Sequence, residues 1–190
     1  MSECPGEARH CYETANVSGF VTQTTNQKSM TTMTTMTALT PRLKSPAELI
    51  PEALQPIQDV YAAAFKTGVP PATLALVHLR ISQINGCAQC IDGGYKHAKQ
   101  AGETDERLFT VTAWREAPYY TEAERAALAL AESITRMSDE PDPVPNEIWD
   151  EAARHYNERE LAGLLVGIAM VNFFNRLNVP TRQVAGEQKW

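Results

Sequence analysis

The sequence lacks an excess of positive charge. Its 190 residues include 17 Lys and Arg against 23 Asp and Glu, which gives a formal net charge of −6 and a pI near 5.3. Binding to nucleic acid or to an anionic membrane surface requires clustered basic side chains. We therefore expect an acidic soluble protein that has neither nucleic acid nor a membrane as a partner.

The sequence also lacks the patterns of a β-sheet and of a membrane span. No stretch shows the strict alternation of apolar and polar residues, rich in β-branched side chains, that is typical of a strand. Apolar residues instead recur at helical spacing after residue 41. The long apolar run at residues 161–171 is shorter than the roughly 20 residues of a transmembrane helix. It favours a buried central helix or a subunit interface. These patterns predict an all-α domain.

Cysteines are few and irregularly spaced, which argues against a disulfide framework. The start of the chain has neither the basic residues nor the apolar segment of a secretion signal. The close pair Cys87 and Cys90 suits a reducing compartment. We therefore expect a cytoplasmic protein.

Residues 1–40 differ in composition from the rest of the chain. They are rich in Thr, Ser and Gln and show no apolar periodicity. Such a segment buries too little apolar area to offset the entropy lost on ordering. The sequence predicts a disordered low-complexity tail at residues 1–40 and a helical domain at residues 41–190. Alternatively, the natural start is Met30, Met33 or Met36, and Cys4 and Cys11 are incidental.

The segment around Cys87 and Cys90 carries the candidate chemistry. Asn85 and Gly86 indicate the end of one helix, because Gly adopts the left-handed conformation without a Cβ penalty. If the next helix begins near Cys87, both sulfurs lie on one face at its positive dipole end, which favours a thiolate. This arrangement is typical of a redox-active dithiol.

Three other interpretations of the cysteine pair remain open at this stage. A structural zinc site needs four ligands, and the chain adds only Cys4, Cys11 and scattered histidines. A structural disulfide over so short a loop would restrain little of the unfolded chain. The third alternative is that both cysteines are reduced, lie in the core and take part in no reaction.

Two further features of the helical pattern lead to expectations about packing. The apolar face of residues 52–67 is expected in the core. Gly93 and Gly94 lie inside a predicted helix, where each costs about 1 kcal/mol relative to Ala. We therefore expect either a closely packed helix or a pocket beside them.

Three segments together resemble a known family. They are Leu79-Arg80-Ile81-Ser82-Gln83-Ile84-Asn85-Gly86-Cys87-Ala88-Gln89-Cys90, then Trp114-Arg115-Glu116-Ala117-Pro118 with Thr121-Glu122-Ala123-Glu124-Arg125-Ala126-Ala127-Leu128, and Asn172-Phe173-Phe174-Asn175-Arg176-Leu177. This combination is similar to the AhpD-like alkylhydroperoxidases of the carboxymuconolactone decarboxylase superfamily. The resemblance implies an AhpD-like helical bundle that assembles into dimers, trimers or hexamers. It also implies thiol peroxidase chemistry without a metal or haem cofactor.

The resemblance implies a role for each cysteine. Cys90 would attack the hydroperoxide and become a sulfenic acid, and Cys87 would condense with it to give a disulfide. An external dithiol would then reduce that disulfide. The helix dipole alone would instead favour Cys87 as the more acidic thiol, because it lies nearer the helix N-terminus.

The chain departs from the family pattern at two positions. The family carries a glutamate and a histidine as proton carriers where this chain has Ala75 and Gly94. His78 and His97 each lie three residues beyond one of these positions, on the same helical face. We hypothesise that His97, with or without His78, replaces the relay, and that Gly94 leaves the space through which His97 reaches Cys90. Alternatively, both are ordinary surface or capping histidines.

Three functions follow as alternatives. The first is thiol-dependent reduction of alkyl hydroperoxides, an activity that we expect to be weak if neither histidine reaches Cys90. The second is a redox-responsive binding protein in which the dithiol only switches conformation. The third is lactone decarboxylation, the other reaction of the superfamily that this chain resembles. The branch that carries it out has a site without cysteines, whereas this chain has the cysteine pair.

Overall fold

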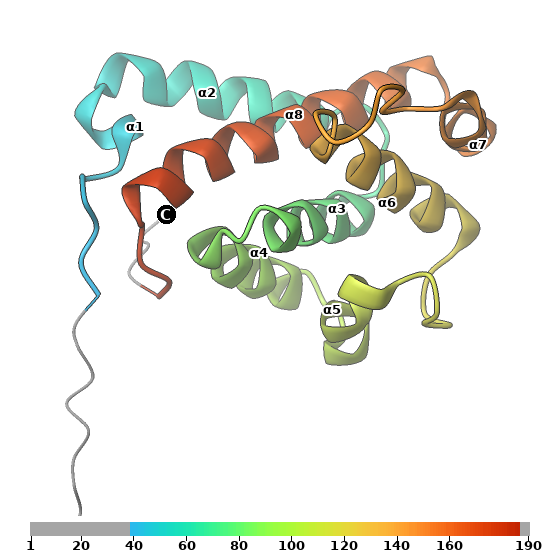
Figure 1. Cartoon of the computed structure of the whole chain (residues 1–190), viewed down its shortest axis with the longest axis horizontal. Coiled ribbons are helices and arrows are strands. Elements are labelled where there is room, and N and C mark those ends of the chain that lie inside the picture. The colour runs from blue at the N-terminus through green and yellow to red at the C-terminus, as the bar shows by residue number, and fades with distance from the viewer. Residues whose placement is uncertain (1–38, 187–190) are drawn as a thin grey trace, which may run out of the picture. The chain divides into compact units, whose positions relative to one another are not determined.

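The computed structural model describes residues 39–186 (Figure 1), and this part of the chain is all-helical, as predicted. The elements are α1 (Pro46–Leu49), α2 (Pro51–Ala64), α3 (Pro71–Ile84), α4 (Ala88–Gln100), α5 (Asp105–Thr110), a 3-10 turn (Val111–Ala113), α6 (Glu122–Thr135), α7 (Asn146–His155) and α8 (Glu158–Thr181). The predicted tail at residues 1–40 lies almost wholly outside the described residues.

Helix α8 is the central element of the domain. It runs between α2 on one side and the α3–α4 pair on the other (Figure 1), and it also contacts α6 and α7. A Cβ at Gly163 would lie 2.0 Å from Oγ1 of Thr67, so only glycine permits this approach between α8 and the α2–α3 link. Helix α8 is central, as expected, but it is only partly buried, because Val166 within the apolar run is 37% exposed.

By length and composition alone, α8 could also cross a membrane. It has 24 residues, and its most apolar window has a mean hydropathy of 1.3 with 39% of that window buried. The central helix of a helical bundle meets the same criteria. Its buried positions include the polar Asn172 and Asn175, which donate to Thr135 on α6 and to Ser82 on α3. Packing within the bundle therefore accounts for the buried positions of the apolar run.

The expectation that the apolar face of α2 lies in the core is wrong for most of the helix. Within α2 only Ala64 is buried, whereas Val60 is 48% exposed, and Phe65, just beyond the helix, is 42% exposed. The reason lies in the packing, because α2 makes its long-range contacts mainly with α8 and has no helix on its outer side. Helical periodicity identifies an apolar face but not whether another element covers it.

Candidate active site

The turn between α3 and α4 sets the position of the two cysteines. Gly86 has a φ of +67°, a conformation that favours glycine, and it follows Asn85 at the end of α3. Cys87 is the N-cap residue of α4, and its sulfur accepts a hydrogen bond of 3.3 Å from the backbone N–H of Cys90. The two side chains form a disulfide. The predicted helix start is confirmed, and the pair is placed at the positive end of the α4 dipole.

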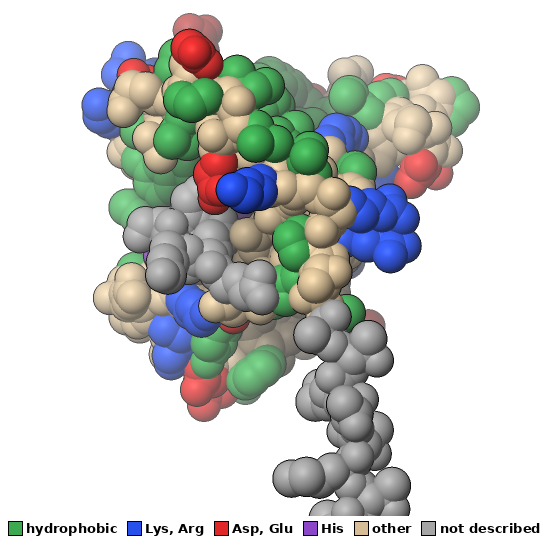
Figure 2. Space-filling view, turned by 90° about the vertical axis from the view of Figure 1, so that its left-hand side faces the viewer, with side chains coloured by type: hydrophobic (Ala, Val, Ile, Leu, Met, Phe, Trp, Pro, Cys, Tyr) green, Lys and Arg blue, Asp and Glu red, His purple; other side chains and the backbone are tan. Residues whose placement is uncertain are grey.

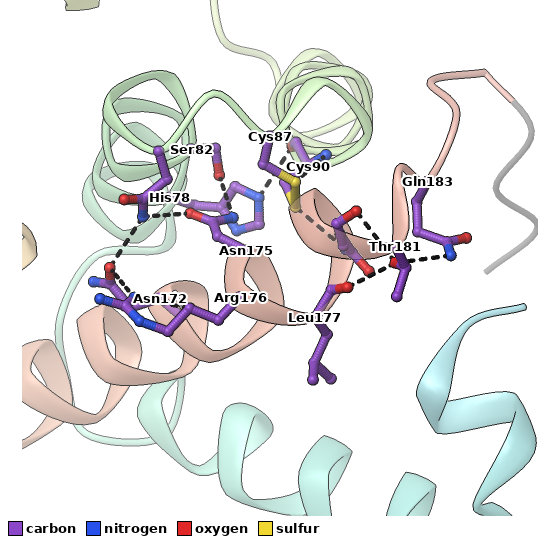
Figure 3. Close-up of a disulfide and its surroundings, with 12 residues drawn as sticks. His78, Ser82, Cys87, Cys90, Asn172, Asn175, Arg176, Leu177, Thr181 and Gln183 are labelled. Atoms are coloured by element: carbon purple, nitrogen blue, oxygen red, sulfur yellow. Dashed lines mark hydrogen bonds between the residues drawn. A yellow bond between two sulfur atoms is a disulfide. The ribbon is translucent and has the colours of Figure 1, made fainter. Parts of the chain in front are cut away.

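Two asparagines of α8 hold this turn in place (Figure 3). The amide of Asn85 donates to Oδ1 of Asn172 at 3.0 Å and to Oδ1 of Asn175 at 2.9 Å. Asn175 in turn donates to the hydroxyl of Ser82, one turn earlier on α3. Asn175 and Ser82 are almost fully buried, so these bonds satisfy groups that would otherwise be costly to bury. The network fixes the α3–α4 turn against α8.

The two cysteines differ in what they face. Cys87 is 2% exposed and lies outside the adjoining pocket. Cys90 is 7% exposed and forms part of the pocket wall. The amide nitrogen of Asn178, on α8, lies 3.3 Å from the sulfur of Cys90 and donates a hydrogen bond to it. A molecule in the pocket therefore meets the sulfur of Cys90 before that of Cys87.

The pocket beside Cys90 has a volume of about 520 Å³, within the range of small-molecule sites. Helices α2, α3, α4 and α8 supply its walls. The lining residues are Gln58, Tyr61, Ala62, Phe65, Pro71, Ala75, His78, Cys90, Gly93, Gly94, His97, Ala98, Ala101, Phe174 and Asn178. Both forms of the expectation are met: Gly93 and Gly94 line a pocket, and at Gly94 the neighbouring helix α3 also packs closely through His78.

His78 links α3 to the helix that carries the cysteines. Its Nε2 lies 3.2 Å from the carbonyl oxygen of Cys90, and its Nδ1 lies 3.2 Å from the hydroxyl of Tyr61. A carbonyl oxygen only accepts, so Nε2 carries the proton and donates. In the neutral ring Nδ1 then accepts from Tyr61. In this disulfide form both ring nitrogens have partners other than sulfur.

The surroundings of His78 keep its ring neutral. Burial lowers the pKa of His78 below its usual 6.5, the bond to the Cys90 carbonyl acts in the opposite direction, and the nearby His97 lowers it further. Burial also raises the pKa of Tyr61 to about 12, so its hydroxyl keeps its proton and remains a donor. The Tyr61–His78–Cys90 chain is therefore uncharged at neutral pH.

The space above Gly94 is not open to His97, which corrects the expectation from the sequence. A Cβ at position 94 would lie 2.7 Å from Cδ2 of His78, so the ring of His78 already occupies that space. His97 is exposed and lines the pocket, and it is close enough to influence the charge of His78. The structure thus brings both histidines to the pocket, but His78 is the one that contacts the cysteine segment.

Sequence reasoning missed Asn178 and Tyr61. Asn178 lies three residues after Asn175, on the same face of α8, so the Asn172–Asn175 motif could have been extended by one helical step. Tyr61 gave no such signal, because it appeared only as an apolar member of the α2 face. Ala75, the other position that departs from the family pattern, lines the pocket.

Metal-ligating side chains do not gather in the described domain. Among residues 39–186, no group of three or more His, Cys, Asp or Glu residues is placed to hold a metal ion. The groups that the structure places around Cys90 are the paired Cys87, the imidazole of His78 and the amide of Asn178, and the cysteine pair gives up two electrons when it is oxidised to the disulfide.

Residues 51–133, from the start of α2 through most of α6, match the sequence pattern of the carboxymuconolactone decarboxylase family. The uncharacterised protein YdfG of Bacillus subtilis (strain 168) is 33% identical over 132 residues, which cover 70% of this chain and 88% of that protein. This chain belongs to the carboxymuconolactone decarboxylase family. The uncharacterised protein YnjA of Escherichia coli (strain K12) is 31% identical over 114 residues, or 60% of each chain.

Solved structures place this member of the carboxymuconolactone decarboxylase family with AhpD-like proteins. A protein of unknown function from Agrobacterium tumefaciens, whose name likens it to the antioxidant defence protein AhpD, superposes with a TM-score of 0.72. It is 28% identical, and the match covers 78% of this chain and all of that chain. The debrominase Bmp8 shares the fold, with a TM-score of 0.66 and 22% identity over 74% of each chain.

Proposed function

We propose that the protein is a thiol-dependent peroxidase that reduces organic hydroperoxides through a Cys87–Cys90 dithiol–disulfide cycle. The observation that carries the proposal is the asymmetry of the pair: Cys90 lines a pocket of about 520 Å³, whereas Cys87 lies behind it. Membership of the carboxymuconolactone decarboxylase family supports the same chemistry. Cys90 is then the attacking thiol and Cys87 the resolving thiol.

The proposed cycle has three balanced steps. The thiolate of Cys90 attacks the terminal oxygen of a hydroperoxide, which breaks the O–O bond, gives a sulfenic acid and releases an alkoxide that takes up a proton as the alcohol. The thiol of Cys87 then displaces water from the sulfenic acid to form the disulfide. An external dithiol reduces this disulfide by exchange and is itself oxidised.

Asn178 and His78 have separate roles in the proposal. The amide of Asn178 donates to the sulfur of Cys90 at 3.3 Å, and a hydrogen bond to the charged form stabilises a thiolate. His78 holds the backbone of Cys90 through its carbonyl and is a positioning residue in the disulfide form. After reduction, the imidazoles of His78 and His97 are the basic side chains of the pocket wall that can exchange a proton with the substrate.

A peroxide-consumption assay with dithiothreitol as the reductant tests the proposal. Cys90→Ser should abolish turnover. In a separate measurement on pre-reduced protein from which the dithiothreitol has been removed, Cys87→Ser should consume one equivalent of peroxide and stop at the sulfenic acid. The control is the Cys4→Ser/Cys11→Ser variant, which should turn over like the wild type. Turnover that persists in Cys90→Ser would refute the thiol mechanism.

Mass spectrometry separates the peroxidase from the redox-responsive alternative. Peroxide treatment of the reduced wild type should remove two hydrogens for each equivalent of peroxide consumed, and dithiothreitol should restore them. Oxidation that occurs once without repeated turnover would favour a protein that responds to oxidants but does not clear them.

We further propose that the protein acts as a homo-oligomer in the cytoplasm, where dithiol reductants keep the cycle running. Exposed apolar residues support an interface at α2 and α8: Val60 and Phe65 lie at α2, and Phe173 and Val179 on α8. Figure 2 shows hydrophobic side chains gathered toward the top of one face, where α1 and α2 lie in Figure 1. Sedimentation velocity should detect an assembly, and Val60→Asp should dissociate it.

A further inference from the structure

The pocket at Cys90 is larger than a hydroperoxide group needs. Its volume of about 520 Å³ is enough for a small organic molecule, whereas the reacting end of a hydroperoxide is only two oxygen atoms. Small residues create this space, because Ala62 on α2, Ala75 on α3 and Ala101 just after α4 all stand in its wall. The volume beyond the sulfur is therefore available to the organic group of a substrate.

Aromatic rings form one wall of the pocket. The ring of Tyr61 meets the edge of Phe65 with centroids 5.3 Å apart, and it meets Phe174 at 5.6 Å, nearly perpendicular in both cases. Both are edge-to-face arrangements of the kind that aromatic groups prefer. Phe65 and Phe174 remain partly exposed, so a further ring could pack against this group.

Charged side chains are missing from this wall. No Lys, Arg, Asp or Glu is among the described residues that line the pocket, and its polar groups are two amides, the Tyr61 hydroxyl, the two histidines and the cysteine. Moving a carboxylate from water into such a site is costly, because no Lys or Arg in the wall compensates its lost hydration. The composition of the pocket thus selects against charged organic groups.

We propose that this pocket binds the organic group of an uncharged, ring-bearing hydroperoxide and presents its peroxide to Cys90. The inference deepens the proposed function, because it uses the same sulfur and names the class of substrate. Hydrogen peroxide and small alkyl hydroperoxides would then react without the contribution of the aromatic wall.

Binding of the product alcohol tests the inference without any turnover. NMR titration of the oxidised full-length protein with 2-phenyl-2-propanol, the alcohol of cumene hydroperoxide, should show saturable binding. Its para-carboxylate analogue should bind at least about tenfold more weakly at pH near 8. Equal binding of the two alcohols, or no binding of either, would overturn the inference.

The kinetic test uses a pair of variants on adjacent residues of α2. Ala62→Phe fills the pocket, whereas Ala63→Phe adds the same ring at an exposed position outside the pocket wall. The ratio of kcat/KM for cumene hydroperoxide to that for hydrogen peroxide should fall roughly tenfold in Ala62→Phe. It should stay near the wild-type value in Ala63→Phe.

The outcomes distinguish the inference from the function on which it rests. Cys90-dependent reduction of hydrogen peroxide, with a ratio that Ala62→Phe leaves unchanged, overturns the substrate class and leaves the peroxidase standing. Saturable binding of 2-phenyl-2-propanol that Ala62→Phe weakens, without turnover of any peroxide, supports the ligand class and refutes the peroxidase.

Discussion

Helix α3 carries His78 and Arg80 two positions apart, and their side chains lie in contrasting surroundings. Arg80 contacts the buried carboxylate of Glu132 on α6, with 2.5 Å between Nε and Oε1. Glu132 also accepts from Arg115 at 2.7 Å and from the indole of Trp114 at 3.1 Å. His78 has two neutral partners and one side open to a cavity.

The contrast separates a structural polar site from a reactive one. Burial by itself would raise the pKa of Glu132, but the bonds from Arg115, Arg80 and Trp114 outweigh it and lower the pKa. Its charge is therefore stabilised by several donors. At His78 burial lowers the pKa and keeps the ring neutral beside free volume. A buried charge that several donors pair holds the fold, whereas a neutral polar ring beside a cavity lies within reach of a bound molecule.

The largest expected effect is on the structural side of α3. Glu132→Ala should lower the free energy of unfolding by about 3 kcal/mol, because it leaves Arg80 partly buried without its counterion. Urea denaturation measures this difference. Glu116→Ala, at an exposed carboxylate in the same region, is the control and should change stability by less than about 0.5 kcal/mol. Equal effects of the two variants would show that the Glu132 cluster adds no stability.

The next effect concerns the reactive side and leaves the fold intact. Asn178→Asp replaces the donor to the sulfur of Cys90 with a negative charge, which should raise the pKa of the Cys90 thiol. The pH dependence of iodoacetamide alkylation in the Cys87→Ser background reports this pKa. Gln58→Glu adds the same charge elsewhere on the pocket wall, and it should raise the pKa less. A larger rise in Gln58→Glu would contradict a direct role for Asn178.

A double-mutant cycle tests the contact between His78 and Gly94. Gly94→Ala should gain about 1 kcal/mol of helix propensity but displace the His78 ring, whose hydrogen bonds are worth about 1 kcal/mol each. The net change should be small or destabilising. In the His78→Ala background the same substitution should stabilise by about 1 kcal/mol, as measured by denaturation. Identical effects in both backgrounds would mean that the ring does not occupy this space.

The smallest effect is a pH dependence of stability. The pKa of His78 is lower in the folded protein than the 6.5 of the free side chain, so below pH 6.5 the unfolded state binds more protons. This stabilising contribution is complete above pH 6.5 and is lost as the pH falls toward the folded pKa. The groups that face the ring are Tyr61, His97 and the Cys90 segment. Between about pH 7.5 and 5.5, His78→Gln should show a shallower loss of stability than the wild type.

Most of the local structure could be predicted from the sequence. Thr121 and Asn157 each form a capping box with the glutamate three residues later, a spacing that the sequence shows directly, and Gly86 follows the end of α3 in the left-handed conformation. These features depend on residues within one turn of each other. The burial of α2 could not be predicted in the same way, since it depends on whether another helix covers that face.

The candidate site was predictable only in part. Helical spacing predicted that the two cysteines share the start of a helix and that His78 and His97 lie near them. The structure places Cys90 and both histidines at one pocket. The contact of Asn178 with Cys90 joins residues 88 positions apart, and the bond between Tyr61 and His78 joins two helices. The roles of Cys90, Cys87 and Asn178 in the reaction stay predictions, which the variants above test.

The sequence by itself determined the helices, the dithiol at the start of α4 and the family, because each follows from short-range spacing or from similarity along the chain. Only the tertiary structure decided which sulfur faces the pocket, and that His78 rather than His97 lies over Gly94. The physical reason is that helical spacing fixes the direction of a side chain within its own helix. The distance across to a neighbouring helix depends on how α2, α3, α4 and α8 pack together.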